Sequence, residues 1–74
     1  MNVDLEVRDR VTRILVECRK EKDISQKELA TAIGSKETTV ASWEQGKSLP
    51  SIDMLYRLAQ YYGKTMNYMY GDEK

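Results

Sequence analysis

Apolar residues in the first third of the chain recur at the spacing of an α-helix. Val11, Ile14, Leu15 and Cys18 stand at positions i, i+3, i+4 and i+7, which places them on one helix face. The pattern predicts a first helix over residues 5–21. Because Cys18 belongs to this apolar face, we interpret it as a small buried hydrophobe rather than a redox site.

A capping box marks the start of a second, shorter helix. The Ser25 hydroxyl can accept a hydrogen bond from the Glu28 amide, and the Glu28 carboxylate can accept one from the Ser25 amide. We expect Gly34 to end this helix, because glycine readily adopts the left-handed conformation found after a helix C-terminus. The inward positions are Leu29, Ala30 and Ile33.

Hydroxyl residues precede three further helical patterns, and we expect Ser35, Ser51 and Thr65 to be their N-caps. The third helix runs to about residue 45, the fourth ends at Gly63, and the fifth ends at residue 69 or 70. The inner positions of the third and fourth helices are Val40, Trp43, Ile52, Leu55, Leu58, Ala59 and Tyr62. Since no useful length of chain alternates with period two, the predicted fold class is all-α, with five helices in one domain over residues 1–74.

Composition narrows the possible functions. The 74 residues include one Cys and no His, which excludes an intramolecular disulfide and a structural zinc site with the usual four ligands. We expect no metal, no cofactor and, without a nucleophile beside a base, no enzymatic activity. No stretch approaches the roughly 20 apolar residues of a membrane-spanning helix or resembles a signal peptide, so we expect a cytoplasmic protein with no membrane partner.

The segment from residue 26 to residue 43 meets the needs of two helices that cross steeply over a tight turn. Ala30 is small enough for two backbones to approach each other there, and Gly34 supplies the turn. Val40 and Trp43 give the second of the two helices an apolar inner face. This spacing is the helix-turn-helix pattern, in which the second helix enters the major groove of DNA.

A longer set of positions carries a family resemblance: Ile24–Ala30, Ile33 and Gly34, Val40, Trp43–Gly46, Pro50 and Ser51, and Leu55–Gly63. Together they resemble the phage repressor/Cro-type, or XRE-type, helix-turn-helix domains. The resemblance covers about residues 10–70. It implies a compact five-helix, lambda-repressor-like fold that binds DNA as a dimer and regulates transcription.

The N-terminal half of the third helix carries the expected base contacts. The side chains that point away from its apolar inner face, and would face the major groove, are Lys36, Glu37, Thr38 and Ser42. In the family, the positions of the last three of these usually contact base edges. The alternative is a solvated polar helix face without a ligand.

Residues around this helix are expected to contact the phosphate backbone. Gln26 matches a phosphate-contacting glutamine of the family, and amides at a helix N-terminus can also hold a phosphate. Lys47 is the best cation of the loop after the third helix. The full set is Gln26, Thr39, Gln45, Lys47 and Ser48, and ordinary surface polarity is the alternative.

Two further expectations concern structure and assembly. The resemblance implies an ion pair between Arg19 and Glu44 that joins the first helix to the end of the third. Tyrosine and methionine, which are enriched at interface cores, accumulate near the C-terminus. The possible dimer-interface residues are Tyr61, Met66, Tyr68, Met69 and Tyr70, with partly exposed tyrosines of no interface role as the alternative.

The leading interpretation is a transcriptional regulator, specifically a repressor. It is expected to bind a palindromic operator as a homodimer and to need no small-molecule ligand. A protein-interaction module on the same fold, such as an antitoxin or anti-repressor component, is the alternative. Twelve basic and twelve acidic residues give a formal net charge of zero, which favours this alternative more than a basic chain would. DNA binding depends on the charge of one face of the protein rather than on the net charge of the whole chain. The equal numbers of basic and acidic residues therefore do not exclude DNA binding, and they predict that it is weak and depends on a dimer.

Overall fold

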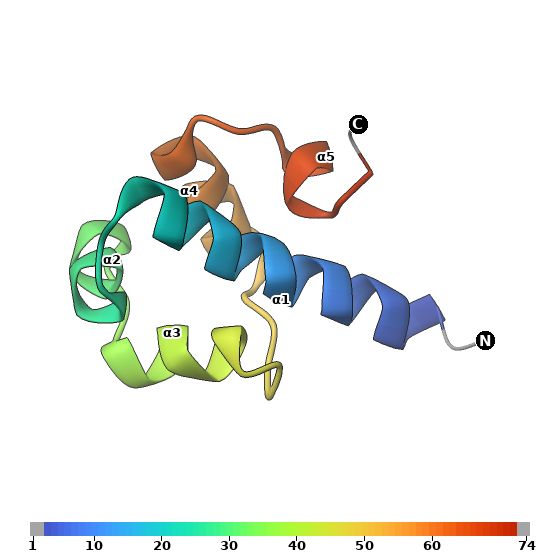
Figure 1. Ribbon diagram of the computed structural model, residues 1–74, viewed down its shortest axis with the longest axis horizontal. Helices are drawn as coiled ribbons and strands as arrows, with labels where there is room; N and C mark the ends of the chain where they lie inside the picture. Colours follow the sequence, from blue (N-terminus) through green and yellow to red (C-terminus); the bar gives the residue numbers. More distant parts are fainter. Residues whose placement is uncertain (1–2, 73–74) are drawn as a thin grey trace.

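The computed structural model describes residues 3–72, which form five α-helices and no β-strand (Figure 1). The helices are α1 (Val3–Lys22), α2 (Gln26–Ile33), α3 (Glu37–Glu44), α4 (Ile52–Tyr62) and α5 (Met66–Met69). The long α1 packs against both α3 and α5, which lie on opposite sides of it. The prediction of an all-α fold with five helices is confirmed. Within the described range, no helix has the length and apolar character needed to cross a membrane.

The core is built from inward residues of all five helices. Its members are Val11, Leu15, Leu29, Ala30, Ile33, Val40, Trp43, Leu55, Leu58, Ala59 and Met69. Most of the predicted inner positions are therefore confirmed, and Cys18 is buried as well. Ile52 is an exception, because it is 68% exposed. It is the first residue of α4, at the end of the helix, where its side chain remains outside the core.

The turn between α2 and α3 explains why one predicted cap is wrong. Gly34 adopts a left-handed φ of 75° and its N–H donates to the Thr31 carbonyl (3.4 Å), while the Ser35 N–H donates to the Ala30 carbonyl (2.8 Å). These two bonds form a Schellman motif, which assigns Ser35 to the end of α2. The N-cap of α3 is instead Lys36, which makes no side-chain capping hydrogen bond.

The other predicted caps are confirmed. The hydroxyls of Ser25, Ser51 and Thr65 each accept a hydrogen bond from the amide three residues later, at 3.0 to 3.2 Å. The Ser25 amide also donates to the Glu28 carboxylate at 3.1 Å, which completes the capping box. Local side-chain chemistry therefore sets the start of α2, α4 and α5.

The C-terminal segment is fastened to α1. The Arg10 Nε donates to the Tyr70 carbonyl at 3.2 Å, and the Arg10 Nη2 lies 3.6 Å from the Asp72 carboxylate. Met69 has no exposed surface and belongs to the core. The prediction that Met69 lies in a dimer interface is therefore wrong, because a side chain without exposed surface cannot contact a second chain.

Candidate nucleic-acid interface

Helix α3 presents one side to the core and the opposite side to solvent. Val40 is completely buried and Trp43 is 4% exposed. With 3.6 residues per turn, the side opposite these two carries the residues at positions 38, 42 and 45. Thr38 and Gln45 are exposed there, and Ser42 is half-buried. We refer to Thr38, Ser42 and Gln45 as the outer strip of α3.

The remaining predicted residues of this region flank the outer strip. Lys36 and Glu37 are exposed at the start of α3, where the helix dipole stabilises the negative charge of Glu37. Thr39 is half-buried and lies to one side, between the outer strip and the core. The predicted base-contacting residues thus share one solvent-facing region.

A hydrogen bond connects the outer strip to the loop that follows it. The hydroxyls of Ser42 and Ser48 lie 2.8 Å apart, and the Lys47 amide donates to the Ser42 carbonyl at 3.0 Å. The structure thus joins a predicted base-contacting residue to a predicted phosphate-contacting one. Because a hydroxyl can both donate and accept, one member of the pair keeps a donor for a second partner.

The predicted ion pair between Arg19 and Glu44 is present and holds three helices together. The Arg19 Nε and Nη2 donate to the two Glu44 carboxylate oxygens at 2.7 and 2.9 Å. The Gln26 amide donates to Glu44 Oε1 at 3.0 Å, and the Arg19 Nη1 donates to the Ile24 carbonyl at 2.8 Å. The hydrogen bond with Glu44 raises the pKa of Arg19. This network fixes the start of α2 against the end of α3 and against α1.

Sequence reasoning missed one cation of this region. The Arg8 Nη2 lies 3.5 Å from the Lys47 carbonyl, although the two residues are 39 positions apart. Nothing in the local pattern distinguishes Arg8 from other polar residues of α1. The structure therefore places positive charge at both ends of the outer strip. Lys36 lies near its N-terminal end, and Lys47 and Arg8 lie near its C-terminal end.

A family model described as helix-turn-helix matches residues 15–69. The chain belongs to this helix-turn-helix family. The resemblance to repressor/Cro-type domains is thereby confirmed, and the chain carries a DNA-binding domain of a transcription regulator. In it, α2 and α3 are the two helices of the motif and α3 is the recognition helix. Neither the curated proteins nor the solved structures gave a match.

The predicted dimer residues near the C-terminus of this helix-turn-helix domain contact their own chain. Tyr61, Met66, Tyr68 and Tyr70 are partly buried against the core. The Lys22 Nζ lies 4.9 Å from the centre of the Tyr61 ring. An interface role for these tyrosines stays a prediction.

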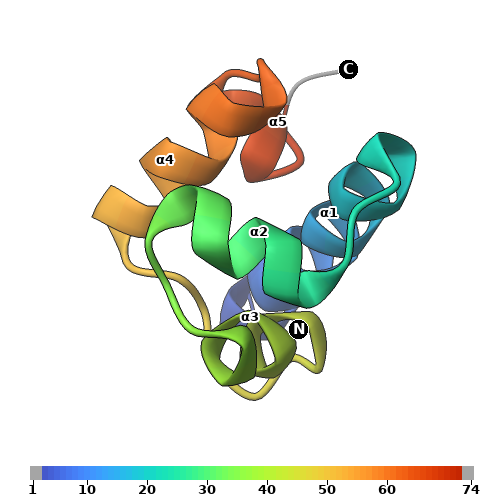
Figure 2. The ribbon, with the colours of Figure 1, turned by 90° about the vertical axis from the view of Figure 1, so that its left-hand side faces the viewer.

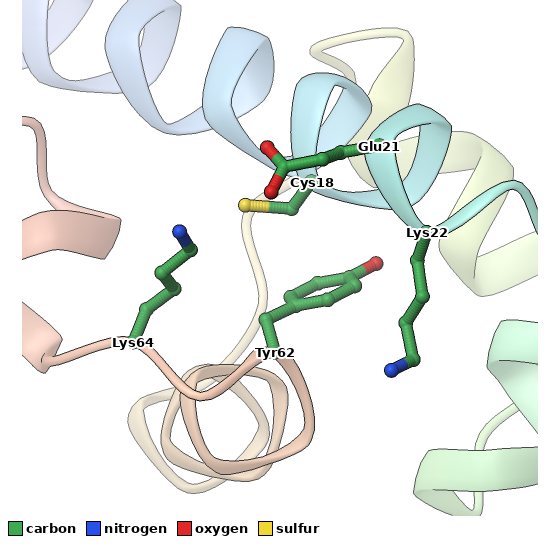
Figure 3. Close-up of a pocket in the computed structure, with 5 residues that line it drawn as sticks. All are labelled: Cys18, Glu21, Lys22, Tyr62 and Lys64. Atoms are coloured by element: carbon green, nitrogen blue, oxygen red, sulfur yellow. The ribbon is translucent and has the colours of Figure 1, made fainter.

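A small cavity lies between α1 and the end of α4, and no α3 residue lines it (Figure 3). Its volume is about 180 Å³, and it is lined by Cys18, Glu21, Lys22, Tyr62 and Lys64. Burial raises the pKa of the Cys18 thiol and that of the Tyr62 phenol. The Tyr62 hydroxyl is buried and has no hydrogen-bond partner in the described part of the chain. The cavity is thus a feature of packing, separate from the outer strip.

The substitution Tyr62→Phe is expected to leave the free energy of unfolding at pH 7 unchanged or to raise it by up to about 1 kcal/mol, because it removes a buried polar atom without a partner. A raised phenol pKa means that the unfolded state loses this proton at lower pH than the folded state. The stability of the parent protein should therefore fall as the pH rises above 10, the ordinary tyrosine pKa.

Urea unfolding at pH 7 and at pH 10.5 tests both statements. The Tyr62→Phe protein should lose less stability between the two pH values than the parent does. Tyr56→Phe is the matched control, since Tyr56 is exposed and should retain the pH dependence of the parent. A loss of stability at pH 7 in Tyr62→Phe would show that the hydroxyl is satisfied in solution.

Proposed function

We propose that this helix-turn-helix protein is a transcriptional repressor that binds a palindromic operator as a homodimer. The proposal rests on the outer strip of α3. Its residues are polar and lie on the solvent-facing side of the helix, while contacts on the opposite side fix the position of the helix. The core residues Val40 and Trp43 and the network around Glu44 restrain α3 on its inner side. A preformed strip of this kind can enter a major groove without reorganising the domain.

The outer strip and the residues that flank it at the start of α3 suit different base contacts. The Thr38 hydroxyl can donate to or accept from a base edge, and its methyl group can pack on the methyl group of thymine. Glu37 can accept a hydrogen bond from a cytosine amino group, and Lys36 can donate to guanine. The Ser42 hydroxyl is shared with Ser48, so we assign it a secondary role beside Thr38.

Phosphate contacts at the edges of the groove would fix the register of α3. Lys47 and Arg8 supply the cations near the C-terminal end of α3, and Ser48 and Gln45 supply neutral donors in the same region. Gln26 uses one of its two amide donors on Glu44, which leaves the second for a phosphate near the start of α2. With few cations per copy, we expect weak binding that depends on two copies acting together.

Fluorescence anisotropy with random and palindromic duplexes across a salt series tests this function. Palindromes that match the operator should bind more tightly than random DNA, and the affinity should fall with salt. If Lys47 and Arg8 of two copies all contact phosphates, the slope of log Kobs against log salt is about −4. Lys47→Ala should lower the affinity for all sequences and reduce the slope magnitude by about 2 per dimer.

Lys64→Ala is the matched control for Lys47→Ala, because Lys64 lies in the turn between α4 and α5, at the opposite end of the molecule from α3 (Figure 1). It should change neither the affinity nor the slope. A folded protein that binds no DNA at 50 mM salt would overturn the proposal. That outcome would support the protein-interaction module, such as an antitoxin or anti-repressor component, which the neutral net charge and the exposed Glu37 favour.

A further inference from the structure

Two large apolar side chains stand open to solvent on the same helix. Ile52 is 68% exposed and Tyr56 is 54% exposed, and the described residues contain no other exposed large hydrophobic residue. Their i, i+4 spacing places them on one side of α4, and Met66 of α5 lines the same surface hollow. Figure 2 shows the first turns of α4 at the outer edge of the molecule. Neighbouring exposed apolar side chains indicate an interaction site, whereas a single exposed apolar side chain is ordinary.

Opposite charges accompany this apolar pair. Asp53 and Arg57 also stand four residues apart, and both line the hollow together with Gln60. Asp53 forms no ion pair with any residue that the structure describes, while the Arg57 Nη1 donates to the Ile33 carbonyl at 3.2 Å. We refer to this surface as the α4 face; its residues are Ile52, Asp53, Tyr56, Arg57, Gln60 and Met66.

The order of the charges makes the α4 face complementary to itself. If two copies of α4 pack antiparallel about a two-fold axis near residue 55, Asp53 of each copy faces Arg57 of the other. Tyr56 of each copy then lies next to the two-fold axis, and Ile52 of each copy lies near Tyr56 of the other, to one side of these ion pairs. Parallel packing would bring like charges together, which is unfavourable. A two-fold axis requires this property, because the same patch must serve on both copies.

We propose that the α4 face is the surface through which two copies of this chain associate. The biological role of this surface rests on the proposed function, because a dimer formed through the α4 face would carry two α3 helices. In this proposal the dimer contact lies on α4 and not on the C-terminal tyrosines that the sequence predicted. Met66 is the one residue common to both sets. The patch has six residues per copy, against about 20–30 per side in a standard interface, so association is weak in solution and is strengthened on DNA.

A charge-reversal experiment without DNA tests the surface. In the Asp53→Arg homodimer two arginines would face each other at each contact, and in the Arg57→Asp homodimer two aspartates would do so. Sedimentation equilibrium should show self-association of each variant weakened at least about tenfold. An equimolar mixture of the two variants pairs an unchanged Asp53 with an unchanged Arg57 at one contact and the two reversed residues at the other. Association in the mixture should therefore recover to that of the parent, and circular dichroism of each variant alone establishes that it is folded.

Two further variants separate the apolar part from general effects of charge. Ile52→Ser should weaken association without loss of stability, because the side chain is mostly exposed in the single chain. Glu17→Arg reverses a charge at an exposed position of α1 and should leave association unchanged. Association that is insensitive to both reversals, or a mixture that fails to recover while both variants are folded, would overturn the proposal.

The outcome is independent of the DNA-binding proposal. A dimer that responds to the reversals but binds no DNA would retain the α4 face and refute the proposed function. Operator binding by two copies in which neither reversal has an effect would retain the function and refute the α4 face.

Discussion

Replacing Glu44 with alanine is expected to lower the free energy of unfolding by about 3–5 kcal/mol, the usual cost of removing one partner from a buried ion pair. The side chains of Arg19 and Glu44 are only 16% and 6% exposed. Without the carboxylate, the guanidinium would keep its bond to the Ile24 carbonyl and lose both bonds to Glu44. Gln26 would lose its partner as well. A domain of this size has about 3–5 kcal/mol of net stability, so we expect most of the Glu44→Ala protein to be unfolded.

Urea or thermal unfolding followed by circular dichroism measures this effect. Glu37→Ala removes the same charge from an exposed position of the same helix and should lower the stability by no more than about 1 kcal/mol, the usual contribution of an acid at a helix N-terminus. The double variant Arg19→Met with Glu44→Leu should recover most of the loss, because a well-packed apolar pair can replace a buried ion pair. Equal stability of Glu44→Ala and the parent would mean that the network carries no net energy.

Replacing Thr38 with alanine is expected to weaken operator binding by about 5- to 150-fold for each copy of the homodimer, because each copy loses one base contact of about 1–3 kcal/mol. Thr38 is the first residue of the outer strip, and its side chain is exposed. The loss should therefore appear in specific affinity and not in stability. Binding to random DNA should change little, since a base contact carries sequence information and a phosphate contact does not.

Anisotropy titrations with operator and random duplexes measure both affinities. Thr31→Ala is the matched control, because Thr31 is an exposed threonine of α2 that lines a hollow with Tyr61, away from α3. It should leave both affinities unchanged. An operator affinity of Thr38→Ala equal to that of the parent would remove Thr38 from the base-contacting set.

Helix positions and most caps could be predicted because they depend on residues within one turn. The spacing of Val11 to Cys18 and the capping box of Ser25 are examples. The prediction failed at Ser35, where two local preferences compete. Serine is a good N-cap, but the Schellman motif after Gly34 makes Ser35 part of the end of α2, and the first carbonyl to accept an α3 amide is that of Lys36. Local preference alone does not decide which of two adjacent motifs takes such a residue.

The candidate site was predictable only in part. The outer strip follows from helix periodicity, and the pairing of Arg19 with Glu44 was indicated by the family resemblance rather than by spacing. The bond between Ser42 and Ser48 and the approach of Arg8 to Lys47 had no signal in the sequence. These contacts depend on where α1 and the loop after α3 lie relative to α3.

The sequence by itself determined the all-α class, the helix-turn-helix and the polar side of α3, because these follow from helix periodicity and from hydrogen bonds between near neighbours. Only the tertiary structure decided that Met69 is buried, that Ile52 is exposed and that Arg8 adds charge beside Lys47. The physical reason is that burial and long-range contact depend on which elements pack opposite a residue. A chain of neutral net charge can therefore still gather cations around its recognition helix.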